Sequence, residues 1–347
     1  MHGASAVTQA AYKLLIAHNI SAIAHDVSPQ AVLKKAPYHL GRFVSYAKIY
    51  LSLLTQKPNQ VYISLSGGMG LYYDLVLIAL ARFKGAQLIF HHHSFAYIHK
   101  PVKIMRLICH LCRNNGYHIF LSPEMKADFI VRYGLETHGP DIQAWSLSNL
   151  AFFAQDKVIK PEKRHRLQTI GYLSNISFDK GIDRFLDILA KLRQQGSQIK
   201  GLIAGPYGSP EVKDYVQKRI NEIGNIDYIG PVYDQAKTDF FAKCDYFIFP
   251  TRYANEAQPM VIFEAQLMGL PVAMSNRGCL GSMAADHDLL LDATSSQYDI
   301  LVNLLLSLEK DHDAFQALSD KAFVRINDLN KQTASYRQAF LNLFKPV

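Results

Sequence analysis

The chain has 347 residues, of which 49% are hydrophobic and 19% are charged, and it carries a net charge of +8. At ~150 residues per domain, this length predicts roughly two domains with sizeable cores. The composition excludes a disordered chain, a collagen-like repeat and a small disulfide-rich scaffold. No apolar run reaches the ~18–20 residues that a bilayer span needs, because Asp74 and Arg82 interrupt the best candidate. The N-terminus lacks the basic stretch and apolar core of a secretion signal.

The positive charge is concentrated in the first half of the chain. Residues 1–160 hold 16 Lys and Arg against 7 Asp and Glu, a balance of +9, whereas residues 161–347 hold 21 against 22, a balance of −1. This asymmetry predicts a basic face that meets an anionic partner; solvated lysines on ordinary helices are the alternative. Because the second half is nearly neutral, we do not expect a nucleic-acid partner.

In chain order, the first half alternates between helices and strands with short connections, which is typical of βαβ units around a parallel sheet. We expect helices at 6–17, 71–83 and 103–114, and strands at 20–28, 61–66, 87–93 and 117–122. The first clear element is a helix, although a doubly wound domain normally opens with a strand. Gly3 resembles the end of a strand-to-helix turn, so we expect the first strand to lie upstream of Met1.

A polar, charged stretch at 155–166 predicts a linker, after which the alternation restarts. Strands are expected at 167–173, 199–205, 226–230, 246–250, 271–275 and 289–292. Helices are expected at 181–194, 211–223, 235–243, 262–268, 298–308, 313–325 and 334–344. These boundaries predict an N-terminal domain over residues 1–160, a second α/β domain over 161–330, and a C-terminal helix over 331–347 that crosses back to the first domain.

Two glutamates, separated by seven residues, follow the strand at 246–250. Glu256 lies in the loop, and Glu264 is expected in the first turn of the next helix, where the helix dipole favours a carboxylate. A carboxylate there can accept hydrogen bonds from ribose hydroxyls, and the N–H groups at the helix start can bind an anion. The spacing predicts a site for phosphate, diol and sugar hydroxyls; an ordinary helix charge and a solvated loop glutamate are the alternative.

The segment Asn255–Val272, read as N-E-A-Q-P-x3-F-E-A-x3-G-x-P-V, resembles the E-x7-E signature of family-4 glycosyltransferases with the GT-B fold. Three further segments resemble motifs of that family in the same order, namely Ile170–Leu189 with Lys-Gly at its helix start, Leu202–Gly208 as a phosphate-proximal loop, and Ile226–Val232 beside the base pocket. The resemblance covers most of residues 168–278. It implies an α/β fold of two Rossmann-like domains facing across a cleft, the first binding acceptor and the second binding donor.

The resemblance implies transfer of a sugar from a UDP- or GDP-sugar to a saccharide or lipid-linked acceptor, with retention at the anomeric carbon and without a metal. Such chemistry serves cell-surface polysaccharide synthesis and needs no cofactor, because the nucleotide sugar is a substrate. Lys180 matches the lysine that neutralises the donor diphosphate, Glu264 the carboxylate on the ribose, and Glu256 a catalytic carboxylate on the donor sugar. The other donor-binding positions it implies are Gly3, Asn175, Gly205, Val232, Asn255, Ala257, Gln258 and Pro259.

Two positions depart from the family pattern. Many members have an arginine after the glycine of the first motif, where this chain has Tyr172, so Asn175 is expected to supply a hydrogen bond instead. The N-terminal glycine loop is represented by Gly3 alone. These departures keep open a non-catalytic binding protein on a degenerate glycosyltransferase scaffold. The Gly-rich turn at 66–70 keeps open a dinucleotide-dependent oxidoreductase or epimerase, although Tyr73 breaks the glycine fingerprint.

Three consecutive histidines end the strand at 87–93. Because side chains alternate along a strand, His91 and His93 share one face and His92 takes the other, so the three do not converge on one metal ion. The family places a histidine here that faces the donor sugar, and His93 is the best match for this catalytic position, with His91 second. Histidines on a basic surface are the alternative.

Other motifs carry less information. The CxxC of Cys109 and Cys112 has no second half, and its apolar helical neighbours predict buried free thiols, which suit a reducing cytoplasm. Two Asp-His-Asp triplets, 286–288 and 311–313, do not follow apolar strands and are not expected to bind a metal.

Lipid-linked acceptors reside at the inner face of the cell membrane, so we expect basic residues to dock the first domain on an anionic leaflet. Examples are Lys34, Lys35, Lys100, Lys103 and Arg106.

Overall fold

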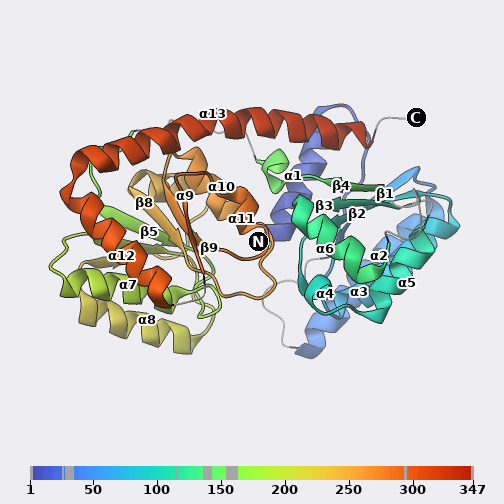
Figure 1. The fold of residues 1–347 in the computed structure, drawn as a ribbon. Helices are drawn as coiled ribbons and strands as arrows, with labels where there is room; N and C mark the ends of the chain where they lie inside the picture. The colour runs from blue at the N-terminus through green and yellow to red at the C-terminus, as the bar shows by residue number, and fades with distance from the viewer. Residues whose placement is uncertain are drawn as a thin grey trace. The chain divides into compact units, whose positions relative to one another are not determined.

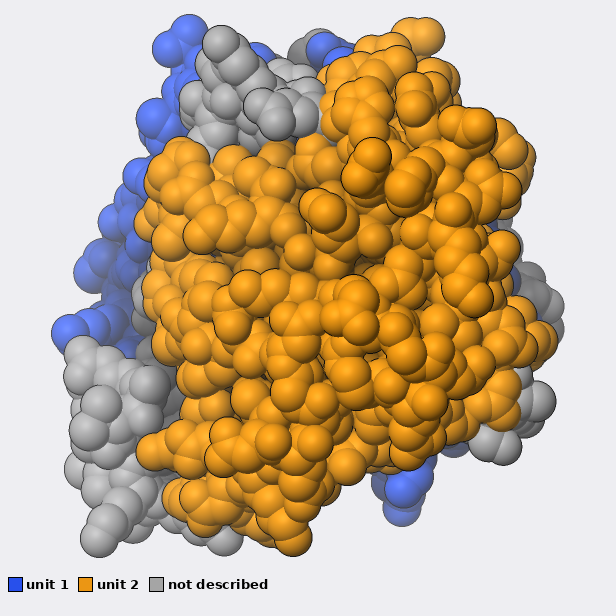
Figure 2. Space-filling view, turned by 90° about the vertical axis from the view of Figure 1, so that its left-hand side faces the viewer, with its two compact units in different colours: residues 1–154, 333–347 blue, residues 155–332 orange. Residues whose placement is uncertain are grey.

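The computed structural model describes residues 3–25, 27, 35–113, 116–135, 143–153, 163–292 and 295–344. The chain divides into two compact units, coloured separately in Figure 2 and built on separate sheets in Figure 1. Unit 1 comprises residues 1–154 and 333–347, and unit 2 comprises residues 155–332. Every strand pairing in both sheets is parallel, as the alternation of strands and helices predicts.

The sheet of unit 1 has four described strands in the order β1-β2-β3-β4. They are β1 (Gln60–Leu65), β2 (Gln87–His92), β3 (Gly116–Phe120) and β4 (Gln143–Ser146). The helices are α1 (Gly3–Ala17), α2 (Lys35–Thr55), α3 (Gly70–Phe83), α4 (Ala96–His99), α5 (Lys103–Cys112), α6 (Pro123–Tyr133) and the 3₁₀ helix η2 (Asn149–Phe152). Each crossover moves one strand further in the same direction, so right-handed connections place α3, α5 and α6 on one face (Figure 1).

The expected strand at 20–28 is wrong for the residues that the structure describes there. Residues 20–25 and 27 have no regular structure, and Ile23 is 65% exposed. Alternating apolar residues make a strand only where a neighbouring strand and a core face receive them, and this segment has neither in the described chain. Sequence reasoning also missed helix α2. The first described element is α1, which begins at Gly3.

The sheet of unit 2 has six strands in the order β10-β9-β8-β5-β6-β7. They are β5 (Thr169–Leu173), β6 (Lys200–Ala204), β7 (Ile226–Tyr228), β8 (Tyr246–Phe249), β9 (Val272–Ser275) and β10 (Leu289–Leu291). The helices are α7 (Ile182–Gln194), α8 (Pro210–Ile223), α9 (Asp234–Ala242), α10 (Met260–Leu267), α11 (Leu280–Met283) and α12 (Ser295–Lys310). All six expected strands are confirmed, and their order is that of a doubly wound Rossmann sheet.

The last helix corrects the expectation of two separate helices at 313–325 and 334–344. Helix α13 (His312–Asn342) runs without a break for 31 residues. The segment between the two expected helices contains no Pro or Gly to end a helix, and Leu329 and Thr333 are buried there. From Thr333 onward the helix belongs to unit 1, where Arg337 Nε donates a 2.9 Å hydrogen bond to the carbonyl of Ala151.

The expected linker at 155–166 lies in part outside the described residues, since 154–162 are not described. In its described end Lys163, His165 and Arg166 are exposed, as in a solvated linker, and Arg164 is buried. Arg164 is 8% exposed, and its Nε donates a 3.0 Å hydrogen bond to the carbonyl of Cys244, beside the Asp245 carboxylate. One charged residue of the stretch, Arg164, therefore fixes the start of unit 2 to the end of α9.

Candidate functional site

The strand order of unit 2 reverses between β5 and β8, which pair directly with each other. In open parallel sheets, ligands bind beyond the carboxyl ends of the strands at such a reversal, because the loops diverge there and leave room. The loop after β5 carries Asn175 and Lys180, and the loop after β8 carries Glu256. The topology thus gathers residues that are far apart in the sequence at the expected ligand position.

Lys180 and Glu256 form an ion pair at this reversal. The Nζ of Lys180 lies 2.6 Å from Oε2 of Glu256, and the hydroxyl of Thr251 donates to the same oxygen over 3.1 Å. The Glu256 side chain is 8% exposed and that of Lys180 is 22% exposed. Lys180 Nζ also lies 4.7 Å from the ring centroid of Tyr253, within the range of a cation–π contact. The pair presents a partly accessible ammonium above a buried carboxylate.

Two side chains hold the loop that carries Lys180. Buried Tyr172 donates its hydroxyl hydrogen to the carbonyl of Lys180 over 3.1 Å. Arg252 donates to the carbonyl of Phe178 over 2.8 Å and pairs with Asp183 at 2.9 Å. The tyrosine that departs from the family pattern therefore supports the lysine. Sequence reasoning missed Arg252, and its position one residue after Thr251 gave no sign of this role.

Two glycines in the loops at the carboxyl edge of the unit 2 sheet leave no room for a side chain, because backbone atoms of other loops lie where a Cβ would be. Gly205 has φ +125°, and a Cβ there would lie 1.7 Å from the carbonyl oxygen of Ser174. Gly181 has φ +81°, and a Cβ there would lie 2.0 Å from the carbonyl oxygen of Pro250. The loops after β5, β6 and β8 are therefore packed backbone against backbone. The expected hydrogen-bonding residue Asn175 is exposed beside them.

Glu264 is not in the first turn of its helix, contrary to the sequence expectation. Helix α10 begins at Met260, two residues earlier than expected, because Pro259 has φ −69° and precedes the helix as its N-cap residue. Glu264 is consequently the fifth helical residue, and the helix dipole acts on it less strongly. Its carboxylate instead forms an ion pair with Lys237 of α9. Sequence reasoning missed Lys237, which lies 27 positions away.

The other unit 2 residues expected to bind the donor lie in the loops after β7 and β8, whereas Gly3 belongs to unit 1 and is the first residue of helix α1. Ala257 and Gln258 are buried, whereas Asn255 and Pro259 are half-buried. A hydrogen bond fixes the loop after β8, since the N–H of Cys279 donates to the carbonyl of Ala257 over 2.9 Å. Val232 is 9% exposed in the segment between β7 and α9.

The three histidines of unit 1 are arranged as the alternation predicts. The rings of His91 and His93 lie with centroids 3.9 Å apart, and the Nδ1 of His91 lies 2.5 Å from the hydroxyl of Tyr62. On the other face, Nε2 of His92 lies 3.0 Å from Nδ1 of His118. Among the described residues, the Nε2 atoms of His91 and His93 are buried without a hydrogen-bond partner.

The alternative of histidines on a basic surface is wrong for His91 and His92, which are fully buried. Burial lowers the pKa of His91 and His92 well below the usual value, and it lowers the pKa of His93 to about 4. All three side chains are therefore neutral near pH 7. A neutral imidazole can donate or accept a hydrogen bond but adds no positive charge to a ligand.

The Gly-rich turn of unit 1 is organised by a buried carboxylate. Asp74 accepts hydrogen bonds from the N–H of Ser66 over 2.8 Å and from the hydroxyl of Tyr46 over 2.6 Å. The same aspartate that interrupts the apolar run in the sequence therefore ties α3 to the end of β1 and to α2. Gly68 has φ +58°, as a tight turn requires.

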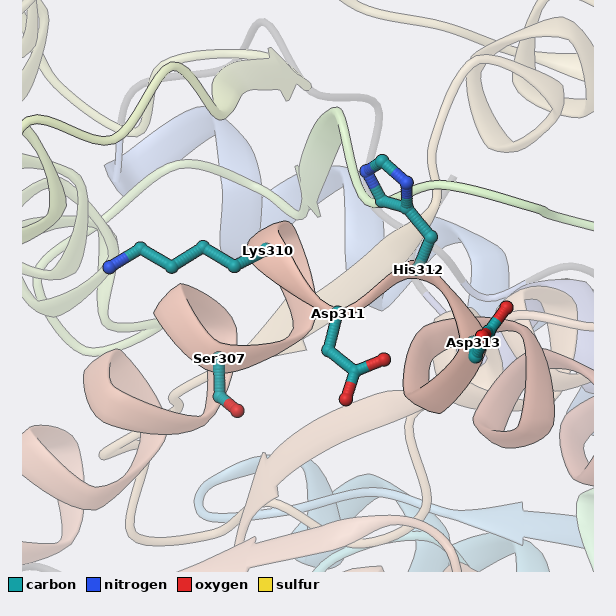
Figure 3. Close-up of a pocket in the computed structure, with 5 residues that line it drawn as sticks. All are labelled: Ser307, Lys310, Asp311, His312 and Asp313. Atoms are coloured by element: carbon teal, nitrogen blue, oxygen red, sulfur yellow. The ribbon is translucent and has the colours of Figure 1, made fainter.

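The cysteine and aspartate motifs have structural roles. All four cysteines are free and buried, and burial raises the pKa of Cys109 and Cys112 to about 12. Asp288 accepts from the N–H groups of Val272 and Ala285, each over 2.9 Å. Asp311 caps α13, and the shallow recess around it (Figure 3) is lined by exposed side chains that point in different directions. In the described chain, no group of three His, Cys, Asp or Glu residues could hold a metal ion.

Known proteins resemble this chain in a family model and in fold. Residues 154–324 match the family model described as glycosyl transferases group 1. No curated protein matches the chain. The fold is mixed α/β with parallel sheets and matches solved GT-B glycosyltransferase structures.

Three solved structures illustrate the match. HepE of Anabaena, in complex with UDP and glucose, has a TM-score of 0.68 and 16% identity, and the match covers 99% of this chain and 95% of HepE. Sucrose-phosphate synthase from Thermosynechococcus elongatus has a TM-score of 0.64 and 16% identity over 93% of this chain and 83% of its own. A TarM mutant of S. aureus, in complex with fondaparinux, alpha-GlcNAc-glycerol and UDP, has a TM-score of 0.65 and 18% identity over 87% of this chain. The chain spans 59% of that TarM chain.

Proposed function

We propose that the protein is a retaining, metal-independent glycosyltransferase of family 4 that moves a sugar from a UDP- or GDP-sugar to a saccharide or lipid-linked acceptor. The observation that carries the proposal is the Lys180–Glu256 pair at the strand reversal of unit 2, inside the segment that matches the family model. An ammonium beside a carboxylate, at the carboxyl ends of parallel strands, suits a donor that carries both phosphates and sugar hydroxyls.

In this scheme unit 2 binds the donor and unit 1 binds the acceptor. Lys180 exchanges part of its pairing with Glu256 for the diphosphate and offsets the charge that develops as the diphosphate leaves. Glu256 then accepts hydrogen bonds from the donor sugar, and Glu264 accepts from the ribose once Lys237 moves aside. His93 acts as a neutral hydrogen-bonding group on the sugar, because its pKa is about 4.

We infer further that the reaction belongs to cell-surface polysaccharide synthesis at the cytoplasmic side of the membrane. Four buried free cysteines suit a reducing compartment. Titration of the full chain with UDP- and GDP-sugars by calorimetry tests the donor class, and release of nucleoside diphosphate tests catalysis. Proton NMR of the product reads the anomeric configuration, and turnover that survives EDTA supports metal independence.

Two outcomes would replace the proposal. Binding of NADH without binding of any nucleotide sugar would favour a dinucleotide-dependent oxidoreductase or epimerase. Tight binding of a nucleotide sugar with no release of nucleoside diphosphate, with or without acceptor, would favour a non-catalytic binding protein. The support that Tyr172 gives to the Lys180 loop is the reason to expect an active enzyme.

A further inference from the structure

Strands β1 and β2 place a tyrosine and a histidine side by side in unit 1. Tyr62 pairs in register with Ile89, and His91 lies two residues further along β2. Because side chains alternate along a strand, Tyr62 and His91 point to the same face of the sheet as diagonal neighbours. The hydroxyl of Tyr62 therefore reaches the ring of His91, where it lies 2.5 Å from Nδ1.

Aromatic side chains hold the Tyr62 ring in this position. The ring of Phe340, in α13, meets it edge-on with centroids 5.9 Å apart, and the ring of Phe344 lies at 6.3 Å. Phe340 also packs against Phe152 of η2, whose ring centroid lies 5.7 Å from that of His91. The end of α13 and η2 thus pack around the Tyr62–His91 pair, and close packing keeps the hydroxyl directed at one atom.

The hydrogen between these two side chains belongs to Tyr62. Burial raises the pKa of Tyr62 well above its usual value and lowers the pKa of His91 well below its own, so the hydroxyl is protonated and the ring is neutral. Among the described residues, the hydroxyl has no hydrogen-bond partner besides Nδ1 of His91. Donation from the hydroxyl to Nδ1 leaves one polar group unsatisfied, namely Nε2, whereas donation from Nδ1 leaves both Nε2 and the hydroxyl hydrogen unsatisfied. The form with its hydrogen on Nε2 is therefore favoured by about tenfold or more.

Nε2 of His91 is consequently a buried donor from which no protein group in the described chain accepts. Native proteins leave few such donors unsatisfied, and each one calls for an explanation. Nε2 of His93 is also buried without a partner among the described residues, and its ring lies against that of His91 with centroids 3.9 Å apart. A hydroxyl group suits this pair, because its oxygen can accept from His91 and its hydrogen can be donated to His93.

We propose that Tyr62 is a positioning residue, which fixes the hydrogen of His91 on Nε2 and so prepares that atom to donate to a hydroxyl of the sugar substrate. The ligand class rests on the proposed function, in which a nucleotide sugar supplies such hydroxyls. The position of the ring hydrogen rests on the contacts of unit 1 alone. Tyr62 and His91 both lie outside the residues that match the family model, so their assignment comes from this chain's own geometry.

Long-range proton–nitrogen NMR of the full chain, labelled with nitrogen-15 histidine, tests the position of the hydrogen, and His91→Asn assigns the ring. His91 is expected to carry its hydrogen on Nε2, and Tyr62→Phe should lower the excess of this form about tenfold. Tyr97→Phe is the matched control on the other face of β2. The hydroxyl of Tyr97 lies 3.0 Å from Nδ1 of His92, so this variant should change His92 and leave His91 as in the parent. A hydrogen on Nδ1 of His91, or a hydrogen position that Tyr62→Phe leaves unchanged, would overturn the proposal.

Turnover tests the role toward the sugar. Tyr62→Phe should lower the rate of nucleoside diphosphate release from a UDP- or GDP-sugar about tenfold, because a smaller fraction of His91 is a donor. It should leave the calorimetric affinity for free UDP or GDP unchanged, since neither carries the sugar, whereas a general loss of structure would lower both. A parent rate in a Tyr62→Phe chain with a displaced hydrogen would overturn this role. A parent chain that binds no nucleotide sugar would remove the proposed function, and an Nε2 hydrogen that depends on Tyr62 would still support the positioning.

Discussion

The two units use their parallel sheets differently. In unit 2 the carboxyl edge of the sheet is built from close backbone contacts and ion pairs, with Gly205 against Ser174 and Lys180 against Glu256. In unit 1 the same edge holds neutral buried histidines and one buried aspartate. Most of the exposed large hydrophobic residues in the described chain also lie in unit 1. The difference teaches that one fold class can hold charged side chains on tightly packed loops at this edge in one unit and neutral buried side chains there in the other.

The sharpest test of this contrast compares glycines at the two edges. Gly205→Ala should lower the free energy of unfolding of unit 2 by more than about 4 kcal/mol, because the new methyl group meets backbone at 1.7 Å and the φ of +125° is unfavourable. Gly67→Ala in unit 1 should cost less than about 1 kcal/mol, because its Cβ would lie 3.8 Å from Ser94 Oγ. Urea denaturation measures both. Equal costs would contradict the contrast.

A fall in pH should lower the free energy of unfolding of unit 1 more than that of unit 2. Burial lowers the pKa of His93 and of His118 from 6.5 to about 4, so the unfolded chain binds these protons at a higher pH than the folded chain. The stability is present above pH 6.5 and is lost as the pH falls towards 4, by about 3 kcal/mol for each histidine. Fluorescence of Trp145, the single tryptophan, reports unit 1 in urea titrations at several pH values.

A variant pair tests the source of that acid sensitivity. His118→Phe should reduce the pH dependence, to which His93 still contributes, whereas His110→Gln, at an exposed position, is the control. A pH dependence that His118→Phe leaves unchanged would mean that other groups cause it.

Removal of the Lys180 ammonium should abolish most of the donor affinity of unit 2. Lys180→Ala should weaken UDP-sugar binding about 100-fold, through loss of a charge-assisted contact and exposure of Glu256 to the diphosphate. Lys213→Ala, on α8, is the control, and calorimetry measures both. The double variant Lys180→Ala with Glu256→Gln keeps the test clear, because it removes the unpaired buried carboxylate. A UDP-sugar affinity that stays at the parent value in Lys180→Ala and in the double variant would argue against this site.

The smallest expected effect concerns the support of the Lys180 loop. Tyr172→Phe removes one hydrogen bond to the carbonyl of Lys180, at a cost of about 1 kcal/mol, so donor affinity should fall about fivefold. Tyr246→Phe, another buried tyrosine of the same sheet, is the control for general loss of a hydroxyl. Equal losses of affinity in the two variants would indicate a general effect on unit 2 and not a positioned loop.

The sequence by itself determined the alternation of strands and helices, because apolar runs, glycines and prolines act over a few neighbouring residues. It predicted the six strands of unit 2, the two faces of the histidine strand and the buried thiols at Cys109 and Cys112. It did not predict the start of α10, the unbroken α13 or the absence of a strand over the described part of 20–28. These depend on which surfaces are available for a segment to pack against.

Only the tertiary structure decided the partners of the site residues. The Lys180–Glu256 pair joins residues 76 positions apart, and the Lys237–Glu264 and Arg252–Asp183 pairs also link separate elements. Sequence spacing carries no information on such pairs, since the strand order of the folded sheet sets the distance between loops. The same holds for Tyr172, which departs from the family pattern in the sequence. In the fold its side chain is buried, and its hydroxyl donates to the carbonyl of Lys180 and so supports that loop.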